Sequence, residues 1–399
     1  MAEAIQRGSW RRSLFLLTGA LLLSTRLALC QEAAWAASPR IDSVEMVRPQ
    51  PIENDPALIW YDDFNGPPRK YSESSGGLDG TENFGGPGGK SMRCLYEKGK
   101  RGVGNRKVFF GDSPIGAIAR KGEKFDEIYW RIYDKHQAGW TGGGPDKMSR
   151  ATSIVSSKWN QAMISHVWGH SEMLTLDPAS GVKGGRVVTT QYNDFPNLHW
   201  LGNKPSSRFK IHGTDESGTW VCVEARAKLN TPGQKDGENQ LWIDGVLECE
   251  RRNLDWRDGY AGHGINAVFL EAYWNNGSPV TQSRWYDNFV ISARPIGPVV
   301  APRNPMLFKA RREGAGPVEE WEVEIAVDRR EDAVVWKSKP VRGEEQVRVG
   351  ETSGQFVGTL SRQKALAADG MYVARARQKS TDGEWSDWSP WHQAFRTTK

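Results

Sequence analysis

The feature that most constrains the fold is a series of short runs in which apolar and polar residues alternate between clusters of Gly, Asn, Asp and Pro. A period of two is typical of half-buried β-strands, and no long segment has the 3.6-residue period of a helix. The runs are 57–64, 91–97, 127–133, 151–156, 162–168, 186–192, 219–229, 240–243, 246–250, 267–273 and 285–292. Asp244-Gly245 predicts a tight hairpin. The pattern predicts an all-β chain built from sandwiches.

Residues 1–36 have the parts of a secretory signal peptide. Arg11 and Arg12 form a positive region, 14–23 is an apolar run, and 34–36 (Ala-Trp-Ala) fits a small-residue cleavage site. The apolar run is too short for a typical spanning helix, and no later segment is apolar enough to cross a membrane. We therefore expect an exported protein, secreted, periplasmic or at the cell surface, with no membrane span.

The net charge of +5 overstates how basic the exported chain is, because four arginines and only two glutamates lie in the signal region. The rest carries no block of like charge. A nucleic-acid-binding protein would show a basic stripe, so nucleic acid is not an expected partner.

The four cysteines have no metal-binding spacing. Cys30 offers a lipid-anchored alternative, which the bulky Leu29 before it disfavours. Cys94, Cys222 and Cys249 lie in strand-like runs and leave two alternatives, three buried thiols or one disulfide with a spare thiol.

Composition divides the chain further. After the signal peptide, a polar Pro-rich lead spans 37–56 and a large sandwich spans 57–293. Four prolines between 294 and 305 predict a stiff linker. The last stretch, 306–399, has the length of one immunoglobulin-like sandwich.

The end of the chain carries the most specific motif, Trp385-Ser386-Asp387-Trp388-Ser389. Upstream, Arg375 and Arg377 share one face of a predicted strand, so their guanidinium groups can interleave with the tryptophan rings. This segment resembles fibronectin type III domains, including WSxWS-bearing members of the family. The resemblance implies a core tryptophan at Trp321 and a corner-tying tyrosine at Tyr372. It leaves open a spacing role or contact with a cell-surface protein.

The large sandwich carries four further motifs, at 60–64 (Trp-Tyr-Asp-Asp-Phe), 220–233, 236–245 and 285–292. They resemble the concanavalin A-like lectin and glucanase superfamily, and more narrowly its polysaccharide lyase-like branches, which implies a jelly-roll sandwich. A glucanase of this fold needs paired carboxylates on one strand, and Glu224 and Glu271 are isolated. The glucanase mechanism is therefore disfavoured.

The lyase resemblance implies an Arg, a His and a Tyr on successive strands of the concave face. Arg150, His166 and Tyr273 follow that order, and Tyr192 is a second candidate acid. The alternatives are that Arg150 only forms a salt bridge with a loop carboxylate and that His166 is a hydrogen-bonded core histidine. The expected substrate contacts are Trp140, stacking from a Gly-rich loop, Lys147 and Asn275.

Asp62, Asp63 and Asp287 lie on the first and last strands of the large sandwich, which are commonly neighbours. Oxygen ligands meeting there would suit a structural calcium ion, the only cofactor expected. The alternative is a set of solvated strand-end aspartates.

Three functions stay open. The first is a polysaccharide-active, lyase-like enzyme that acts on an acidic or plain extracellular glycan, with a uronate-containing glycan as one candidate. The second is a lectin-like module that binds a polysaccharide without cutting it. The third is a cell-surface adhesion protein in which both sandwiches serve contact. Side chains converging in one groove would distinguish them.

Overall fold

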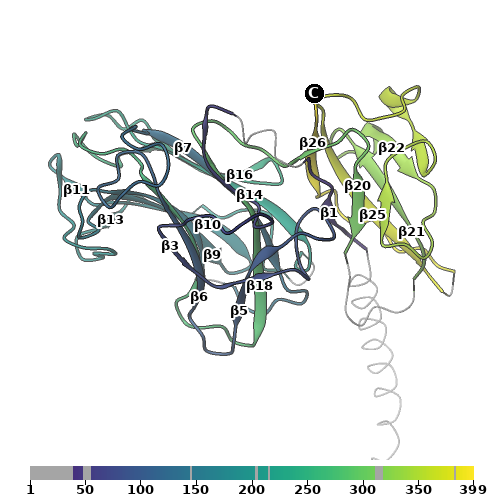
Figure 1. The fold of residues 1–399 in the computed structure, drawn as a ribbon, viewed down its shortest axis with the longest axis horizontal. Helices are drawn as coiled ribbons and strands as arrows, with labels where there is room; N and C mark the ends of the chain where they lie inside the picture. The colour runs from purple at the N-terminus through teal and green to yellow at the C-terminus, as the bar shows by residue number, and fades with distance from the viewer. Residues whose placement is uncertain are drawn as a thin grey trace, which may run out of the picture.

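The computed structural model describes residues 39–47, 55–143, 146–202, 205–213, 216–310, 318–381 and 383–399, and the predicted signal peptide lies outside them. Within these residues the protein is all-β, and its only helical turns are η2 (Glu331–Ala333) and η3 (Gly358–Leu360). Two sandwiches lie side by side (Figure 1). The predicted fold class is confirmed. No helix of the described part is long and apolar enough to cross a membrane.

The first sandwich has two large antiparallel sheets. One has seven strands in the order β13-β10-β9-β8-β17-β6-β3. Its strands are β3 (Glu73–Ser75), β6 (Gly102–Phe109), β8 (Asp146–Ile154), β9 (Gln161–His170), β10 (Met173–Ser180), β13 (His199–Trp200) and β17 (Ala267–Trp274). A small ribbon, β11 (Val182–Lys183) with β12 (Arg186–Val187), follows β10.

The facing sheet has eight strands, seven along the path β16-β15-β14-β7-β18-β5-β4 and an eighth, β2, which pairs with β18. These strands are β2 (Leu58–Asp62), β4 (Gly77–Asp79), β5 (Ser91–Tyr96), β7 (Glu127–His136), β14 (Trp220–Lys228), β15 (Gly237–Ile243), β16 (Val246–Leu254) and β18 (Gln282–Ser292). Alternate side chains from both sheets form the core, including Trp130 and Tyr286 of the eight-stranded sheet and Leu270 of the seven-stranded sheet. The opposite face of the seven-stranded sheet is left for polar side chains.

The predicted hairpin at Asp244-Gly245 is confirmed. Ile243 pairs with Val246, and φ is 47° at Asp244 and 75° at Gly245. Positive φ at both central residues is the conformation that an Asp-Gly turn favours in a two-residue hairpin.

Three strand predictions need correction. The run 186–192 is a strand only over Arg186–Val187, and Tyr192 lies in the loop beyond it. The alternation pattern also missed two eight-residue strands, β6 and β10, the second of which contains Pro178. Proline is tolerated there because β13 pairs with β10 only at Ala179 and Ser180, so β10 is an edge strand at Pro178.

The second sandwich contains a six-stranded sheet, β19-β26-β25-β21-β22-β24, and a three-stranded sheet, β1-β20-β23. The strands are β1 (Ile41–Val44), β19 (Val300–Ala301), β20 (Met306–Lys309), β21 (Val318–Ala326), β22 (Val334–Ser338), β23 (Gln346–Arg348), β24 (Gly354–Phe356), β25 (Met371–Ser380) and β26 (Ala394–Thr397).

Two predicted boundaries therefore change. The Pro-rich lead contains β1, which pairs with β20 and belongs to the second sandwich, so the first sandwich is inserted after that strand. Figure 1 shows β1 among the C-terminal strands. The predicted linker contains β19, and its residues Ile296 and Gly297 donate backbone hydrogen bonds to the Glu224 carboxylate at 2.8 and 2.7 Å. The prolines thus occupy a docked segment.

The predicted ladder in the second sandwich is confirmed. Arg375 lies 4.8 Å from the Trp388 ring centre, and Arg377 lies 4.5 Å from Trp385 and 4.6 Å from Trp388. Trp321 is buried, and the Tyr372 hydroxyl accepts the backbone N–H of Ala367 at 2.9 Å. These contacts account for the motif by packing within the sandwich.

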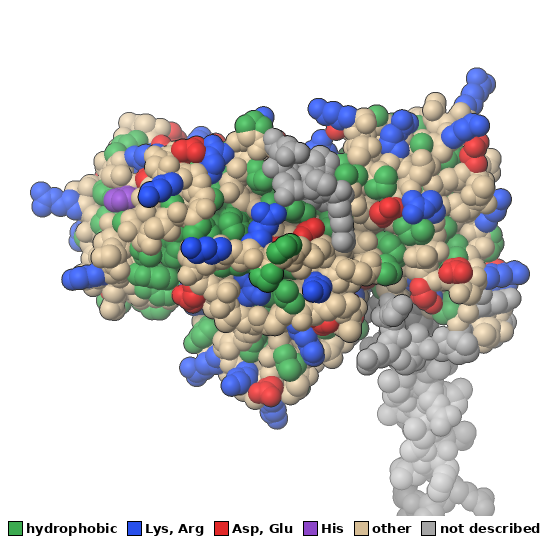
Figure 2. All heavy atoms as spheres, in the orientation of Figure 1, with side chains coloured by type: hydrophobic (Ala, Val, Ile, Leu, Met, Phe, Trp, Pro, Cys, Tyr) green, Lys and Arg blue, Asp and Glu red, His purple; other side chains and the backbone are tan. Residues whose placement is uncertain are grey.

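The three cysteines of the described part are buried free thiols, so the predicted alternative of a disulfide is not formed. Basic and acidic side chains are interspersed over both sandwiches on the face shown in Figure 2.

Candidate functional site

A groove of about 950 Å³ lies on the outer face of the seven-stranded sheet. Strand register builds its floor. His166 of β9 pairs with Arg150 of β8, Arg150 pairs with Phe269 of β17, and Phe269 pairs with Lys107 of β6. Because directly paired residues point to the same face, these four side chains form one row across the sheet.

A second row crosses the same strands. Trp168 pairs with Lys147, and Lys147 pairs with Tyr273. Glu271 lies on β17 midway between the two rows, since residues 269, 271 and 273 share a face. The loop that carries Tyr192, Asn193 and Phe195 also lines the groove.

Arg150 is the centre of a buried network. Its Nε and Nη2 donate to the two Glu271 oxygens at 2.9 and 2.6 Å, and its Nη1 donates to Asn193 Oδ1 at 2.7 Å. Nη2 also donates to the Tyr192 hydroxyl, which itself donates to Glu271 Oε1 at 3.3 Å. Arg150 therefore forms a salt bridge, but its partner Glu271 lies on strand β17 and not in a loop as the alternative expected.

The network sets the charges of its members. Burial alone would raise the pKa of Glu271, but the Arg150 guanidinium outweighs it and holds that pKa below its usual value. Burial raises the pKa of Tyr192, since Arg150 only partly offsets it. Glu271 is thus ionised and Tyr192 protonated at neutral pH, which leaves Arg150 neutralised by protein groups.

Lys147 carries the ammonium that the protein leaves available to the groove. Burial, and then the nearby charge of Arg150, lower the pKa of Lys147. Its Nζ lies 5.0 Å from the centre of the Tyr273 ring. Within the described residues no carboxylate lies within 4.0 Å of this Nζ. Lys107, by contrast, pairs with Glu73 at 2.8 Å.

One side of the groove is aromatic. The His166 ring stacks on Trp168 with centroids 5.3 Å apart and lies 6.2 Å from Trp200. Trp200 is 41% exposed and Phe195 is 52% exposed. Broad exposed rings of this kind suit contact with the apolar face of a sugar.

Six of the predicted site residues line this one groove, namely Arg150, His166, Tyr192, Tyr273, Lys147 and Asn275. The prediction for Trp140 is wrong. Its side chain is only 3% exposed and packs in the core against Tyr96 and Trp274. A tryptophan in a Gly-rich loop can turn inward when the sandwich end offers an aromatic pocket.

The predicted calcium ligands do not form a shared site. Asp62 accepts hydrogen bonds from Phe64 N and the Tyr71 hydroxyl, both at 2.8 Å. Asp287 accepts Phe84 N at 2.7 Å, and Asp63 accepts Asn65 N at 3.1 Å. These three carboxylates are not among the described groups whose oxygen and nitrogen atoms gather closely enough to hold an ion. Asp62 and Asp287 are buried, so they are not solvated aspartates either.

Sequence reasoning missed several groove residues, namely Glu271, Lys107, Trp168, Asn193, Phe195 and Trp200. Glu271 had a usable signal, because it is two residues from Tyr273 on one strand face. Trp200 had no usable signal in the sequence, since its loop reaches the groove only through the pairing of Ala179 with Trp200.

No family model matches the sequence, and no curated protein matches it. Among solved structures, the chain is similar to alginate lyase vAL-1 from Chlorella virus, with 14% identity and a TM-score of 0.39 over 55% of this chain and 90% of that one. It is also similar to endo-β-1,4-glucuronan lyase from the fungus Trichoderma reesei, with 12% identity and a TM-score of 0.37 over 63% and 94%. The PL-14 alginate lyase from Aplysia kurodai matches with 14% identity and a TM-score of 0.38 over 59% and 98%. Likenesses this distant do not assign a substrate to this chain.

Proposed function

We propose that the protein is an exported polysaccharide lyase that cleaves a uronate-containing extracellular glycan by β-elimination in this groove. The observation that carries the proposal is the second row. An ammonium, Lys147, lies against a tyrosine, Tyr273, on the neighbouring strand, and His166 lines the same groove.

β-Elimination from a uronate needs three groups. A cation neutralises the carboxylate and so acidifies the C5 proton, a base removes that proton, and an acid protonates the departing O4. Lys147 suits the first role, because it lines the groove and no described carboxylate lies within 4.0 Å of its ammonium. Tyr273 and His166 suit the proton transfers, since both are groove-lining groups that can carry a proton.

Arg150 has a different role from the one first expected of it. Its three guanidinium nitrogens already donate to Glu271, Asn193 and Tyr192. It is therefore proposed as a positioning residue that holds the Tyr192 loop over the sheet, while Lys147 meets the substrate carboxylate.

A second candidate is a lectin-like module that binds the glycan without cutting it. The aromatic wall of Trp168, Trp200 and Phe195 favours this function, because stacking rings bind sugars without needing a base. In either case the second sandwich is proposed as a fibronectin type III module that spaces the first or contacts a surface protein.

The test is to incubate the purified chain with a panel of uronate polymers and follow the ultraviolet absorbance of the new C4–C5 double bond. A lyase produces a rise that Lys147→Ala abolishes and that Tyr273→Phe slows by about 10²-fold or more, the usual contribution of acid–base catalysis. Lys158→Ala, at an exposed lysine away from the groove, is the matched control and should retain full activity.

The other outcomes of this experiment also distinguish between the two proposed functions. No absorbance with any polymer, together with retention of the protein in a polymer-containing gel, would establish the binding module. If the protein neither produces absorbance nor is retained in the gel, both proposals are overturned. Export is tested separately by the N-terminal mass of protein recovered from the medium or periplasm, which should begin near residue 37.

A further inference from the structure

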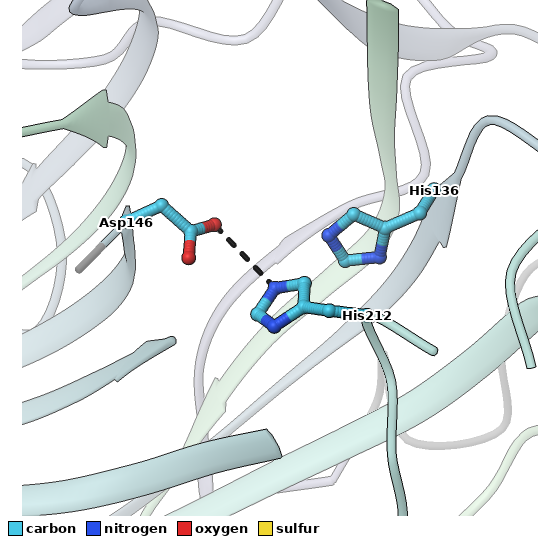
Figure 3. A group of neighbouring side chains, drawn as sticks. All are labelled: His136, Asp146 and His212. Atoms are coloured by element: carbon cyan, nitrogen blue, oxygen red, sulfur yellow. Dashed lines mark ion pairs between the residues drawn. The ribbon is translucent and has the colours of Figure 1, made fainter. Parts of the chain in front are cut away.

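A second polar cluster lies inside the first sandwich, away from the groove surface. His136 ends β7, Asp146 begins β8, and His212 lies in the loop after β13. Their exposures are 1%, 1% and 3%. One nitrogen or oxygen atom from each lies within 4.8 Å of the others, and Figure 3 shows the side chains directed toward one another.

The spacing in this cluster fits metal ligands better than a hydrogen bond. His212 Nε2 lies 3.5 Å from Asp146 Oδ2. A hydrogen bond between these atom types is about 2.7–3.2 Å long. Two ligands on a tetrahedral Zn²⁺ with bonds of about 2.0–2.1 Å are about 3.4 Å apart.

Several atoms at the centre lack hydrogen-bond partners among the described residues. They are His136 Nε2, Asp146 Oδ1 and both ring nitrogens of His212. Buried polar atoms without partners are rare in folded proteins, and each calls for an explanation such as an ion.

Neighbouring polar side chains orient two of these residues, His136 and Asp146. His136 Nδ1 lies 3.0 Å from Asp134 Oδ2, which fixes the ring so that Nε2 faces the cluster. Arg284 Nη1 donates to Asp146 Oδ2 at 2.7 Å. Metal-binding histidines and carboxylates are commonly oriented by such outer hydrogen bonds.

Buried acidic groups also favour a cation. Asp134 and Asp146 are both fully buried, and within the described residues Arg284 is the one guanidinium that pairs with them, at 3.9 and 2.7 Å. Gly169 of β9 lies against the cluster, because a Cβ there would lie 1.9 Å from Asp146 Oδ1.

We propose that His136, Asp146 and His212 bind a divalent transition-metal ion of the Zn²⁺ class, which joins the two sheets of the first sandwich. Two imidazoles and one carboxylate suit zinc, whereas calcium and magnesium prefer oxygen ligands alone. β7 belongs to the eight-stranded sheet and β8 to the seven-stranded sheet. The ion would also fix the start of β8, where Lys147 follows Asp146.

The test uses the mature chain without a polyhistidine tag, freed of metal by a chelator and titrated with Co²⁺. A tetrahedral or five-coordinate site gives intense visible absorption that saturates at one ion per chain and is displaced by Zn²⁺. Metal should also raise the melting temperature. Absence of both effects in the wild-type chain would overturn the proposal, and this measurement does not depend on any variant folding.

Variants locate the site. His212→Gln should abolish the cobalt spectrum, and Asp134→Asn should weaken binding about 10- to 100-fold, as expected for a partner of a ligand. His199→Ala, which removes an exposed histidine on β13, is the control and should bind normally. Binding that survives His212→Gln, or that His199→Ala removes, would also refute the assignment.

Discussion

The Arg150–Glu271 pair offers the sharpest test of how the groove is held together. Arg150 is 1% exposed, and both Glu271 oxygens accept its hydrogen bonds. Replacing Glu271 with Ala leaves a guanidinium buried without a compensating charge. The free energy of unfolding should fall, because the buried Arg150 charge loses the carboxylate that compensates it.

The size of this loss in unfolding free energy depends on the hydrogen bonds that Arg150 keeps. Removing one partner of a buried ion pair costs about 3–5 kcal/mol. Asn193 and Tyr192 still accept hydrogen bonds from Arg150, so we expect the lower value, about 3 kcal/mol. For a sandwich of this size each kcal/mol lowers the melting temperature by about 2–4 °C, so Glu271→Ala should lower it by about 6–12 °C.

Scanning calorimetry of the full chain measures this shift. The matched control is Glu73→Ala, which breaks the Lys107 pair on the same sheet. Because the Glu73 side chain is 48% exposed, that pair contributes about 0–1 kcal/mol. The double variant Arg150→Met with Glu271→Met should recover most of the loss, since apolar replacement of a whole buried pair is often neutral.

Two results would refute this reasoning. One is a fall for Glu271→Ala no larger than that for Glu73→Ala. The other is a double variant as unstable as the single one. The pH dependence adds a check. The pKa of Glu271 is lowered in the folded state, so the pair stabilises fully above the unfolded pKa and loses its effect only as pH falls through the folded pKa.

Further predictions concern the turn and the ladder. Burial raises the pKa of Asp244 to about 7, so its protonated form stabilises the fold at low pH and this contribution is lost as pH rises from about 4 to 7. Asp244→Asn should remove that dependence and melt higher than wild type at pH 8 in a thermal scan. A lower melting temperature would contradict it. In the ladder, Trp388→Leu loses contacts with two arginines and Trp385→Leu loses one, at about 0.5–2 kcal/mol each. Calorimetry should therefore show Trp388→Leu as the less stable variant, and the reverse order would argue against the ladder.

Much of the fold was predictable from local pattern. Period-two alternation found most strands, and Asp244-Gly245 found its hairpin, because both depend on neighbouring residues alone. Of the missed strands β6 and β10, β10 has a proline that resembles a turn signal. The groove was partly predictable, since the resemblance implied an Arg, a His and a Tyr on strands of one face, and Arg150, His166 and Tyr273 all line it.

The rest depended on contacts between distant segments. Glu271 and Arg150 are 121 residues apart in the sequence. β1 and β20 pair although the whole first sandwich lies between them in the sequence. Trp140 was expected to reach the groove from a Gly-rich loop, yet it is buried, and the loop residue His212 is buried too. Their placement depends on the space left between the packed sheets.

The sequence by itself therefore determined the strand pattern, the tight turns and the arginine–tryptophan ladder, since each follows from residues close together along the chain. Only the tertiary structure decided which charges are neutralised within the protein and which face the groove. It also decided that His136, Asp146 and His212 meet. The physical reason is that pairing register and burial, which bring distant side chains within hydrogen-bonding distance, are properties of the folded sheets and of no single segment.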